Sequence, residues 1–146
     1  MRGDRSQAGT SVSELAQIVR DHELPLFRTI GEFLVGWADA EGGSPAEGLA
    51  AMRRGVENLR EHNAVVFDGI IKIALAEAEA GAGDPERALA VLDEALATCE
   101  RTSGRAFECE LHRARGDILL KRDPNPAPAE EAFLTAIAVA KEQARD

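Results

Sequence analysis

Three histidines and two cysteines are the side chains of this sequence most capable of metal binding or nucleophilic chemistry. The histidines are His22, His62 and His112, and the thiols are Cys99 and Cys109. Zinc sites depend on short ligand spacings, and the sequence has neither a Cys-x-x-Cys pair nor a His-Glu-x-x-His motif. Cys109 and His112 lie three residues apart, but nothing around them supplies the rest of a catalytic site. We therefore predict no metal site, no cofactor and no enzymatic activity.

Charge and composition exclude further classes of protein. The chain carries 26 acidic and 17 basic residues, which gives a net charge of −9. Because the basic residues are scattered, a polyanion such as DNA or RNA would meet a repulsive field. No segment approaches the roughly 20 apolar residues of a membrane span, and residues 1–10 lack the apolar stretch of a signal peptide. We expect no nucleic-acid partner, no membrane partner and a cytoplasmic location, where free thiols stay reduced.

The elements that would position any functional side chain follow from an internal repeat. Several residues recur at a spacing of 40, namely Phe27, Phe67 and Phe107; Gly36, Ala76 and Gly116; Pro45 and Pro85. A second pattern matches Gly48, Met52, Gly55 and Val56 to Ala88, Leu92, Ala95 and Leu96, and, at a spacing of 41, to Ala129, Phe133, Ala136 and Ile137. The extra residue falls near the proline-rich loop 123–126, where an insertion costs little. The chain therefore divides into about three and a half units.

Each unit contains two helical patterns, with apolar residues at i, i+4, i+7 and i+11. Expected helices cover about residues 11–21, 25–41, 45–60, 64–80, 85–100 and 127–143, and a further one carries Phe107, Leu111, Ala114 and Ile118. Ser44 and Asp84 are the expected N-caps, each before a proline in the first helical turn. The helix at 64–80 is apolar nearly all round, so we expect it to be the most buried.

Helices of this length, joined by short loops, fold back on each other as hairpins. Each hairpin leaves an apolar face that only the next hairpin can cover. The predicted fold is therefore all-α, an α-solenoid of about three hairpins and roughly seven helices, preceded by a half repeat. We expect a flexible segment at 1–10 and a single helical-repeat domain at 11–146. The repeated small residues would allow the helices of a hairpin to approach closely.

The second helices carry a pattern that resembles the tetratricopeptide (TPR) repeat. It is visible as Ala88-x-x-x-Leu92-x-x-Ala95-Leu96 and as Ala129-x-x-x-Phe133-x-x-Ala136-Ile137, although the spacing is 40 where that repeat has about 34 residues. The segment Glu110-Leu111-His112-Arg113-x-x-Gly116-Asp117-x-Leu119-Leu120 resembles more specifically the helical-repeat tail of large bacterial signalling ATPases, many of which carry a class III nucleotide cyclase or a DNA-binding regulator. The phosphate-binding loop Gly-x-x-x-x-Gly-Lys-Ser/Thr is missing from the sequence, so the resemblance implies the tail alone, a sensing or docking module.

In TPR-like solenoids the first helices of successive hairpins line a groove. Counted from the small residues, the inward positions of this chain are Phe33, Trp37, Ile73, Glu77, Arg113 and Asp117. Trp37 is the only tryptophan, and on an inner wall it would anchor a peptide or helix. The alternative is that Trp37 packs in the core or beneath the opening helix.

Three functions follow from this expectation. The first is a non-catalytic protein-interaction scaffold that takes a protein or peptide partner, as a regulatory part of a bacterial signalling protein. The second is a small-ligand sensor, for which Arg113, Glu77 and Asp117 are the plausible polar set. The third is a homodimer formed through the opening helix, with Val12, Leu15 and Val19, or through the C-terminal helix. The sequence does not choose the partner or the parent protein.

Overall fold

The computed structural model describes Glu14, Gln17 and residues 25–61, 68–102 and 105–145. These residues form helices and contain no strand, which confirms the all-α class for the described part of the chain. The elements are α2 (Pro25–Glu41), α3 (Pro45–Glu61), α4 (Asp68–Gly81), α5 (Pro85–Thr102), the short 3-10 helix η2 (Arg105–Phe107), α6 (Glu108–Arg122) and α7 (Ala127–Arg145).

The helix boundaries agree closely with those expected from the repeat. The predicted ranges 25–41, 45–60, 85–100 and 127–143 correspond to α2, α3, α5 and α7, and the last three end one or two residues later than expected. Residues 64–67, at the start of the predicted fourth helix, lie outside the described residues. Of the predicted opening helix at 11–21, Glu14 and Gln17 are described and both are helical. Val12, Leu15 and Val19 lie outside the described residues.

Local chemistry explains where α5 begins. Asp84 is its N-cap, because the carboxylate oxygen Oδ1 accepts a hydrogen bond of 3.0 Å from the backbone N–H of Arg87. Pro85 occupies the first helical position, where a missing N–H leaves no bond unmade. Gly83 just before has a φ of 93°, a left-handed conformation that glycine adopts without steric cost. The turn therefore reverses the chain within three residues.

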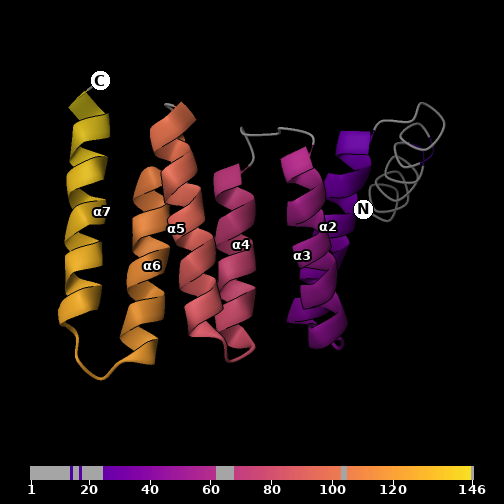
Figure 1. The fold of residues 1–146 in the computed structure, drawn as a ribbon, viewed down its shortest axis with the longest axis horizontal. Coiled ribbons are helices and arrows are strands. Elements are labelled where there is room, and N and C mark those ends of the chain that lie inside the picture. The colour runs from indigo at the N-terminus through magenta and orange to yellow at the C-terminus, as the bar shows by residue number, and fades with distance from the viewer. Residues whose placement is uncertain (1–13, 15–16, 18–24, 62–67, 103–104, 146) are drawn as a thin grey trace, which may run out of the picture.

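Consecutive helices pair into hairpins that follow one another in chain order. The close pairs are α2 with α3, α4 with α5, and α6 with α7. Each pair also contacts the next, because α4 packs against both α2 and α3, and α6 packs against both α4 and α5 (Figure 1). The packing of α6 on α5 is more extensive than that of α4 on α3.

Small residues let the two helices of a hairpin approach closely. A Cβ atom added to Gly48 of α3 would lie 2.2 Å from the backbone nitrogen of Ala40 in α2, and one added to Gly36 would lie 2.8 Å from the Cβ of Ala51. In the third hairpin, a Cβ on Gly116 would lie 2.7 Å from the ring of Phe133. Ala76 of the second hairpin is fully buried. The predicted close approach is therefore confirmed at Gly36 and Gly116, and Ala76 at the same repeat position is buried.

The core consists of two clusters of buried side chains. One contains Phe33, Met52 and Ile71 among its members, and the other contains Leu92 and Leu111. Helices α4 and α5 supply side chains that pack in both clusters. Among the described residues, the middle hairpin thus packs against hairpins on two sides, whereas α2–α3 and α6–α7 each pack against one.

The phenylalanines spaced by 40 do not share one environment. Phe27 is 60% exposed on α2, whereas Phe107 ends η2 half-buried and packs on Gly69 of α4. Phe67 lies outside the described residues. The repeat is therefore kept at the small helix-contact positions and not at this aromatic one.

Candidate functional site

The predicted groove positions on α2 and α4 differ in their solvent exposure. Trp37 is 44% exposed, which favours the surface reading over the core reading. Phe33 is only 3% exposed and packs against Gly55, so the prediction that it exposes apolar area is wrong. The absence of a side chain at Gly55 opens the space that the Phe33 ring fills. Ile73 is half-buried against the core.

The charged groove positions form a stripe across two successive first helices. Arg113 of α6 bonds Glu110 at 2.9 Å and Asp117 at 2.6 Å on its own helix. The hydrogen bond to Glu110 raises the pKa of Arg113 most, and the negative charges of Glu110, Asp117 and Glu77 add to the effect. Glu77 belongs to α4 and is exposed, and its charge contributes to the raised pKa of Arg113 on α6.

Three large apolar side chains of α2 besides Trp37 are exposed. Phe27, Leu34 and Val35 are 60%, 54% and 63% exposed. Large exposed apolar patches on soluble proteins mark interaction sites more often than isolated apolar residues do. The run from Phe33 to Val35, followed by Trp37, is too broad for a single buried stripe, and this breadth is the sequence signal for an exposed apolar face.

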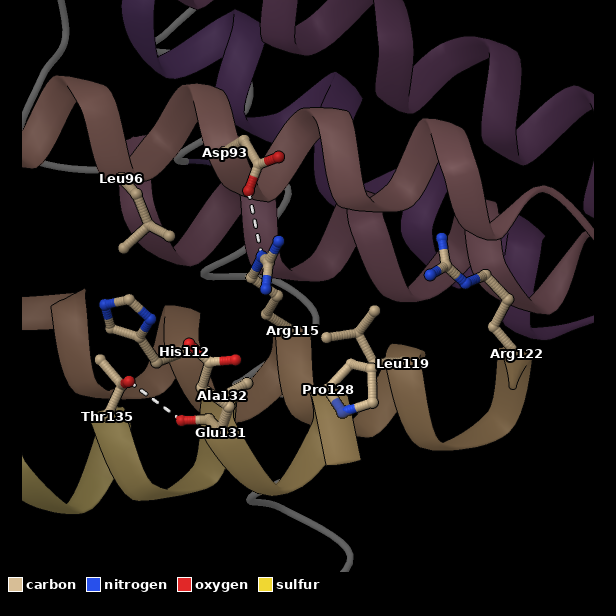
Figure 2. A pocket seen from close by; sticks show the side chains of 10 residues that line it. All are labelled: Asp93, Leu96, His112, Arg115, Leu119, Arg122, Pro128, Glu131, Ala132 and Thr135. Carbon is tan, nitrogen blue, oxygen red and sulfur yellow. Dashed lines mark hydrogen bonds and ion pairs between the residues drawn. The ribbon is translucent and has the colours of Figure 1, made fainter. Parts of the chain in front are cut away.

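A pocket of about 540 Å³ lies between the second and third hairpins (Figure 2). Helix α5 forms one wall, α6 the base and α7 the other wall. Its lining residues are Asp93, Leu96, His112, Arg115, Leu119, Arg122, Pro128, Glu131, Ala132 and Thr135. None of the six predicted groove residues lines this pocket. Sequence reasoning missed it because a pocket arises from side-chain sizes at a contact between hairpins.

Polar groups at the pocket are partly paired with each other. The Nε of Arg115 donates to Asp93 at 3.1 Å, and Arg122 bonds Glu86 at 2.6 Å. Burial lowers the pKa of His112, the nearby positive charge of Arg115 lowers it further, and Glu108 opposes both. His112 is therefore neutral at neutral pH.

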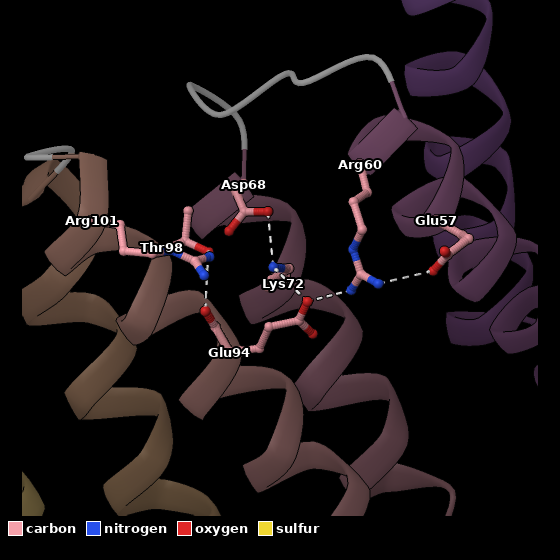
Figure 3. Close-up of polar contacts among 7 residues, drawn as sticks. All are labelled: Glu57, Arg60, Asp68, Lys72, Glu94, Thr98 and Arg101. Atoms are coloured by element: carbon pink, nitrogen blue, oxygen red, sulfur yellow. Dashed lines mark hydrogen bonds and ion pairs between the residues drawn. The ribbon is translucent and has the colours of Figure 1, made fainter.

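The junction between the first and second hairpins holds buried charges. The carboxylate of Glu79, which is 1% exposed, accepts two hydrogen bonds of 2.7 Å from Arg53 and lies 3.4 Å from Arg87. Lys72 is also buried, 3.0 Å from Asp68 and 3.6 Å from Glu94 (Figure 3). These charges were not expected, because the sequence pattern predicted an almost wholly apolar helix at 64–80.

Neighbouring side chains extend this charge cluster across the junction. Arg60 of α3 pairs with Glu94 of α5 and, at 3.4 Å, with Glu57 on its own helix (Figure 3). One oxygen of Asp68, Oδ2, is buried without a hydrogen-bond partner among the described residues. The bridges from α3 to α4 and from α3 to α5 hold two hairpins together through charged groups.

The thiols and imidazoles of the described residues form no recognisable reactive site. Cys99 is buried, and burial raises the pKa of its thiol, whereas Cys109 is half-buried; both are free. Within the described ranges, no three His, Cys, Asp or Glu side chains are placed to hold a metal ion. His22 and His62 lie outside the described residues. No helix among the described ones is long and apolar enough to cross a membrane.

Comparisons with known proteins identify no relative of this chain. No protein-family model matches the sequence, and neither the curated proteins nor the solved structures give a match. The internal repeat is therefore the basis on which one part of the molecule is compared with another.

Proposed function

We propose that this chain is a non-catalytic protein-binding module, an α-solenoid of TPR-like hairpins that serves as a regulatory part of a bacterial signalling protein in the cytoplasm. The stacking of α2, α4 and α6 on one another supports the solenoid. The close approach at Gly36 and Gly116 and the burial of Ala76 support the TPR-like character, because each hairpin uses a small residue at the same repeat position.

The exposure of Trp37 carries the proposal. Tryptophan is among the residues most enriched in the energetic centres of protein interfaces, and Trp37 is 44% exposed, three positions from the exposed Leu34 on α2. The charged stripe formed by Glu77, Arg113 and Asp117 adds polar groups on the following first helices. A partner helix or peptide with an apolar anchor for Trp37 and charged flanks would complement this surface.

The test uses Trp37 both as the altered residue and as the reporter. Proteins captured from an extract of the source cell with the wild-type chain are compared with those captured by the Trp37→Ala variant. A protein retained by the wild type alone is then purified and titrated while Trp37 fluorescence is recorded. We expect a blue shift on binding, because the indole leaves water, and a loss of about 2 kcal/mol or more in Trp37→Ala.

Leu134→Ala is the matched control, because Leu134 is also an exposed apolar residue, 59% exposed, but lies on α7. It should retain the partner. If the purified partner binds Trp37→Ala as tightly as wild type and leaves the emission unshifted, the groove assignment fails. A partner lost from both variants would likewise contradict a site on α2.

Self-association through α7 is a second candidate function. Ile137 occupies the repeat position of Val56 and Leu96, which are half-buried against the core, yet Ile137 is 51% exposed. Leu134 is exposed on the same helix, and no further hairpin covers these two side chains among the described residues. Light scattering at two concentrations tests this: a mass that rises with concentration and returns to that of one chain in Ile137→Glu supports the dimer. A constant single-chain mass excludes it.

A further inference from the structure

The two junctions between hairpins can be compared position by position, because the repeat relates them. Helices α4 and α6 correspond at a spacing of 40, as do α3 and α5, and α5 and α7 correspond at a spacing of 41. The junction of α3, α4 and α5 is thus the internal counterpart of the junction of α5, α6 and α7. Buried charged side chains occupy the first junction, and the second contains the pocket.

Long charged side chains fill the first junction. Lys72 and Glu79 project from α4 and are both buried, at 3% and 1% exposure. Arg53 of α3 and Arg87 of α5 hold the carboxylate of Glu79. Glu94 of α5 lies beside Lys72 (Figure 3). The buried side chains of Lys72 and Glu79 are therefore paired within the chain.

Shorter or apolar side chains occupy the same places in the second junction. The counterparts of Arg53, Lys72, Glu79, Arg87 and Glu94 are Asp93, His112, Leu119, Pro128 and Thr135, in that order. All five line the pocket of about 540 Å³. The volume that the first junction fills with lysine, arginine and glutamate is open in the second, and it falls in the range of roughly 300–1,000 Å³ typical of small-molecule sites.

Two charged groups at this pocket have bonding capacity left. Arg115 takes the position of the buried Leu75, and of its guanidinium only Nε is bonded among the described residues, to Asp93. The carboxylate of Glu131 on the opposite wall has no ion pair with a described residue (Figure 2). The apolar side chains of Leu96, Leu119 and Ala132 also line the pocket.

We propose that this pocket binds a small zwitterion with an apolar body, the chemistry of an apolar amino acid or an apolar dipeptide. The ligand carboxylate bonds the free terminal N–H groups of Arg115, and the ligand ammonium pairs with Glu131. The apolar side chain packs on Leu96, Leu119 and Ala132. The charged lining residues are Arg115, Arg122, Asp93 and Glu131, which balance, so a ligand without net charge fits best.

This inference is independent of the proposed partner surface. On an α-helix each residue turns by about 100°, so His112, Arg115 and Leu119 face roughly opposite to Arg113 and Asp117 on α6. The Trp37→Ala variant should therefore bind the small ligand unchanged. A failure of one proposal leaves the other standing.

The experiment is isothermal titration calorimetry of the whole chain with leucine and with leucyl-leucine. The matched probes are N-acetyl-leucine, which lacks the ammonium, and leucinamide, which lacks the carboxylate. We expect one of the two zwitterions to bind, which identifies the source, and each matched probe to bind at least about tenfold more weakly. Arg115→Gln and Glu131→Gln should each weaken binding by about tenfold, whereas Arg113→Gln on the opposite face of α6 should change it less than about twofold.

A pocket-filling variant gives a second, independent readout. His112→Lys combined with Thr135→Glu reproduces the pair that Lys72 and Glu94 form in the first junction and should abolish binding while the helical circular dichroism is retained. If neither leucine nor leucyl-leucine binds the wild type, the proposal is overturned. It is equally overturned if binding persists undiminished in Arg115→Gln and Glu131→Gln, a result that does not depend on the filled variant folding.

Discussion

Glu79 shows at the scale of single residues how this chain tolerates a charge in its interior. Its carboxylate is 1% exposed, and moving a carboxylate out of water costs several kcal/mol unless it is paired and hydrogen-bonded. Arg53 supplies two bonds of 2.7 Å, and this pairing raises the pKa of the arginine. Arg53 is itself 38% exposed, so the cost of burial falls mostly on the carboxylate.

Removing the Arg53 side chain should therefore destabilise the folded state strongly. We expect Arg53→Met to lower the free energy of unfolding by about 3 kcal/mol, because it leaves Glu79 buried with only Arg87 at 3.4 Å. Urea unfolding followed by circular dichroism measures the loss. Arg113→Met is the control, since its partners Glu110 and Asp117 are about half exposed and such pairs contribute less than about 1 kcal/mol.

A companion variant separates the buried charge from simple loss of packing. Arg53→Met combined with Glu79→Leu removes both charges, and it should recover most of the lost stability. An equal loss in Arg53→Met and Arg113→Met would show that Glu79 is not buried as described.

His112 provides the residue-scale prediction for pH. Burial lowers its pKa in the folded state, so the unfolded chain binds a proton at His112 at higher pH than the folded chain does. Above the unfolded value of about 6.5 the imidazole contributes nothing to the pH dependence, and below it protonation favours unfolding. Stability should thus fall more steeply in wild type than in His112→Gln as the pH is lowered from about 7.5 to about 5.5.

The carboxylates and cations around His112 also influence how stability depends on pH. Glu108 and Arg115 on α6, Asp93 on α5 and Glu131 on α7 are present in both proteins, so their contributions cancel in the comparison. Thermal melts across the pH range give the two slopes. A steeper fall in His112→Gln than in wild type would reverse the sign and contradict the burial of the imidazole.

At the scale of elements, substitutions of two glycines separate the effect of close helix contact from the effect of helix propensity. Gly48→Ala would place a Cβ atom 2.2 Å from the backbone nitrogen of Ala40, and backbone cannot move aside as a side chain can. We expect a loss of about 2 kcal/mol from the forced separation of α2 and α3. Gly31→Ala, in α2 with nothing within 4 Å, should instead gain about 0.8 kcal/mol from helix propensity. Urea midpoints of the two variants should move in opposite directions, and a stabilised Gly48→Ala would contradict the close contact.

The helices themselves could be predicted from the sequence, because their signals are local. Prolines, an aspartate cap and the apolar period locate α2, α3, α5 and α7 to within two residues. The orientation of individual side chains could not be predicted so well. Phe33 is buried because Gly55 of the next helix leaves room for its ring, and α4 buries Lys72 and Glu79 because partners on α3 and α5 neutralise them. These outcomes depend on residues more than 20 positions away in the chain, which periodicity within one helix does not contain.

The pocket illustrates the same limit more strongly. Its base and walls come from three helices, and no residue in it is unusual for its own helix. The pocket is explained when the two junctions are aligned by the repeat, because the large charged side chains of the first junction correspond to smaller or apolar side chains in the second. The repeat aligns the positions of the two junctions, but the structure is needed to show which of these positions face the junction.

At the scale of the whole molecule, stability should be distributed unevenly along the row of hairpins. Helices α4 and α5 take part in both core clusters, whereas α2 and α7 each have one cluster beside them. In a stacked array a terminal unit can open without disturbing its neighbours' other contacts. We expect amide hydrogen exchange, measured by mass spectrometry on peptic fragments, to be slowest in α4 and α5 and fastest in α2 and α7.

Arg53→Met tests whether the first junction transmits this protection. If buried charge pairs hold the first hairpin to the second, the variant should speed exchange in α2 and α3 by about a hundredfold, which corresponds to about 3 kcal/mol, and leave α6 and α7 nearly unchanged. A compact bundle with one cooperative core would instead show the same acceleration in every helix, because all slow amides would then exchange through global unfolding. The pattern of exchange therefore decides between a row of semi-independent hairpins and a single cooperative unit, which is the physical premise of the proposed binding module.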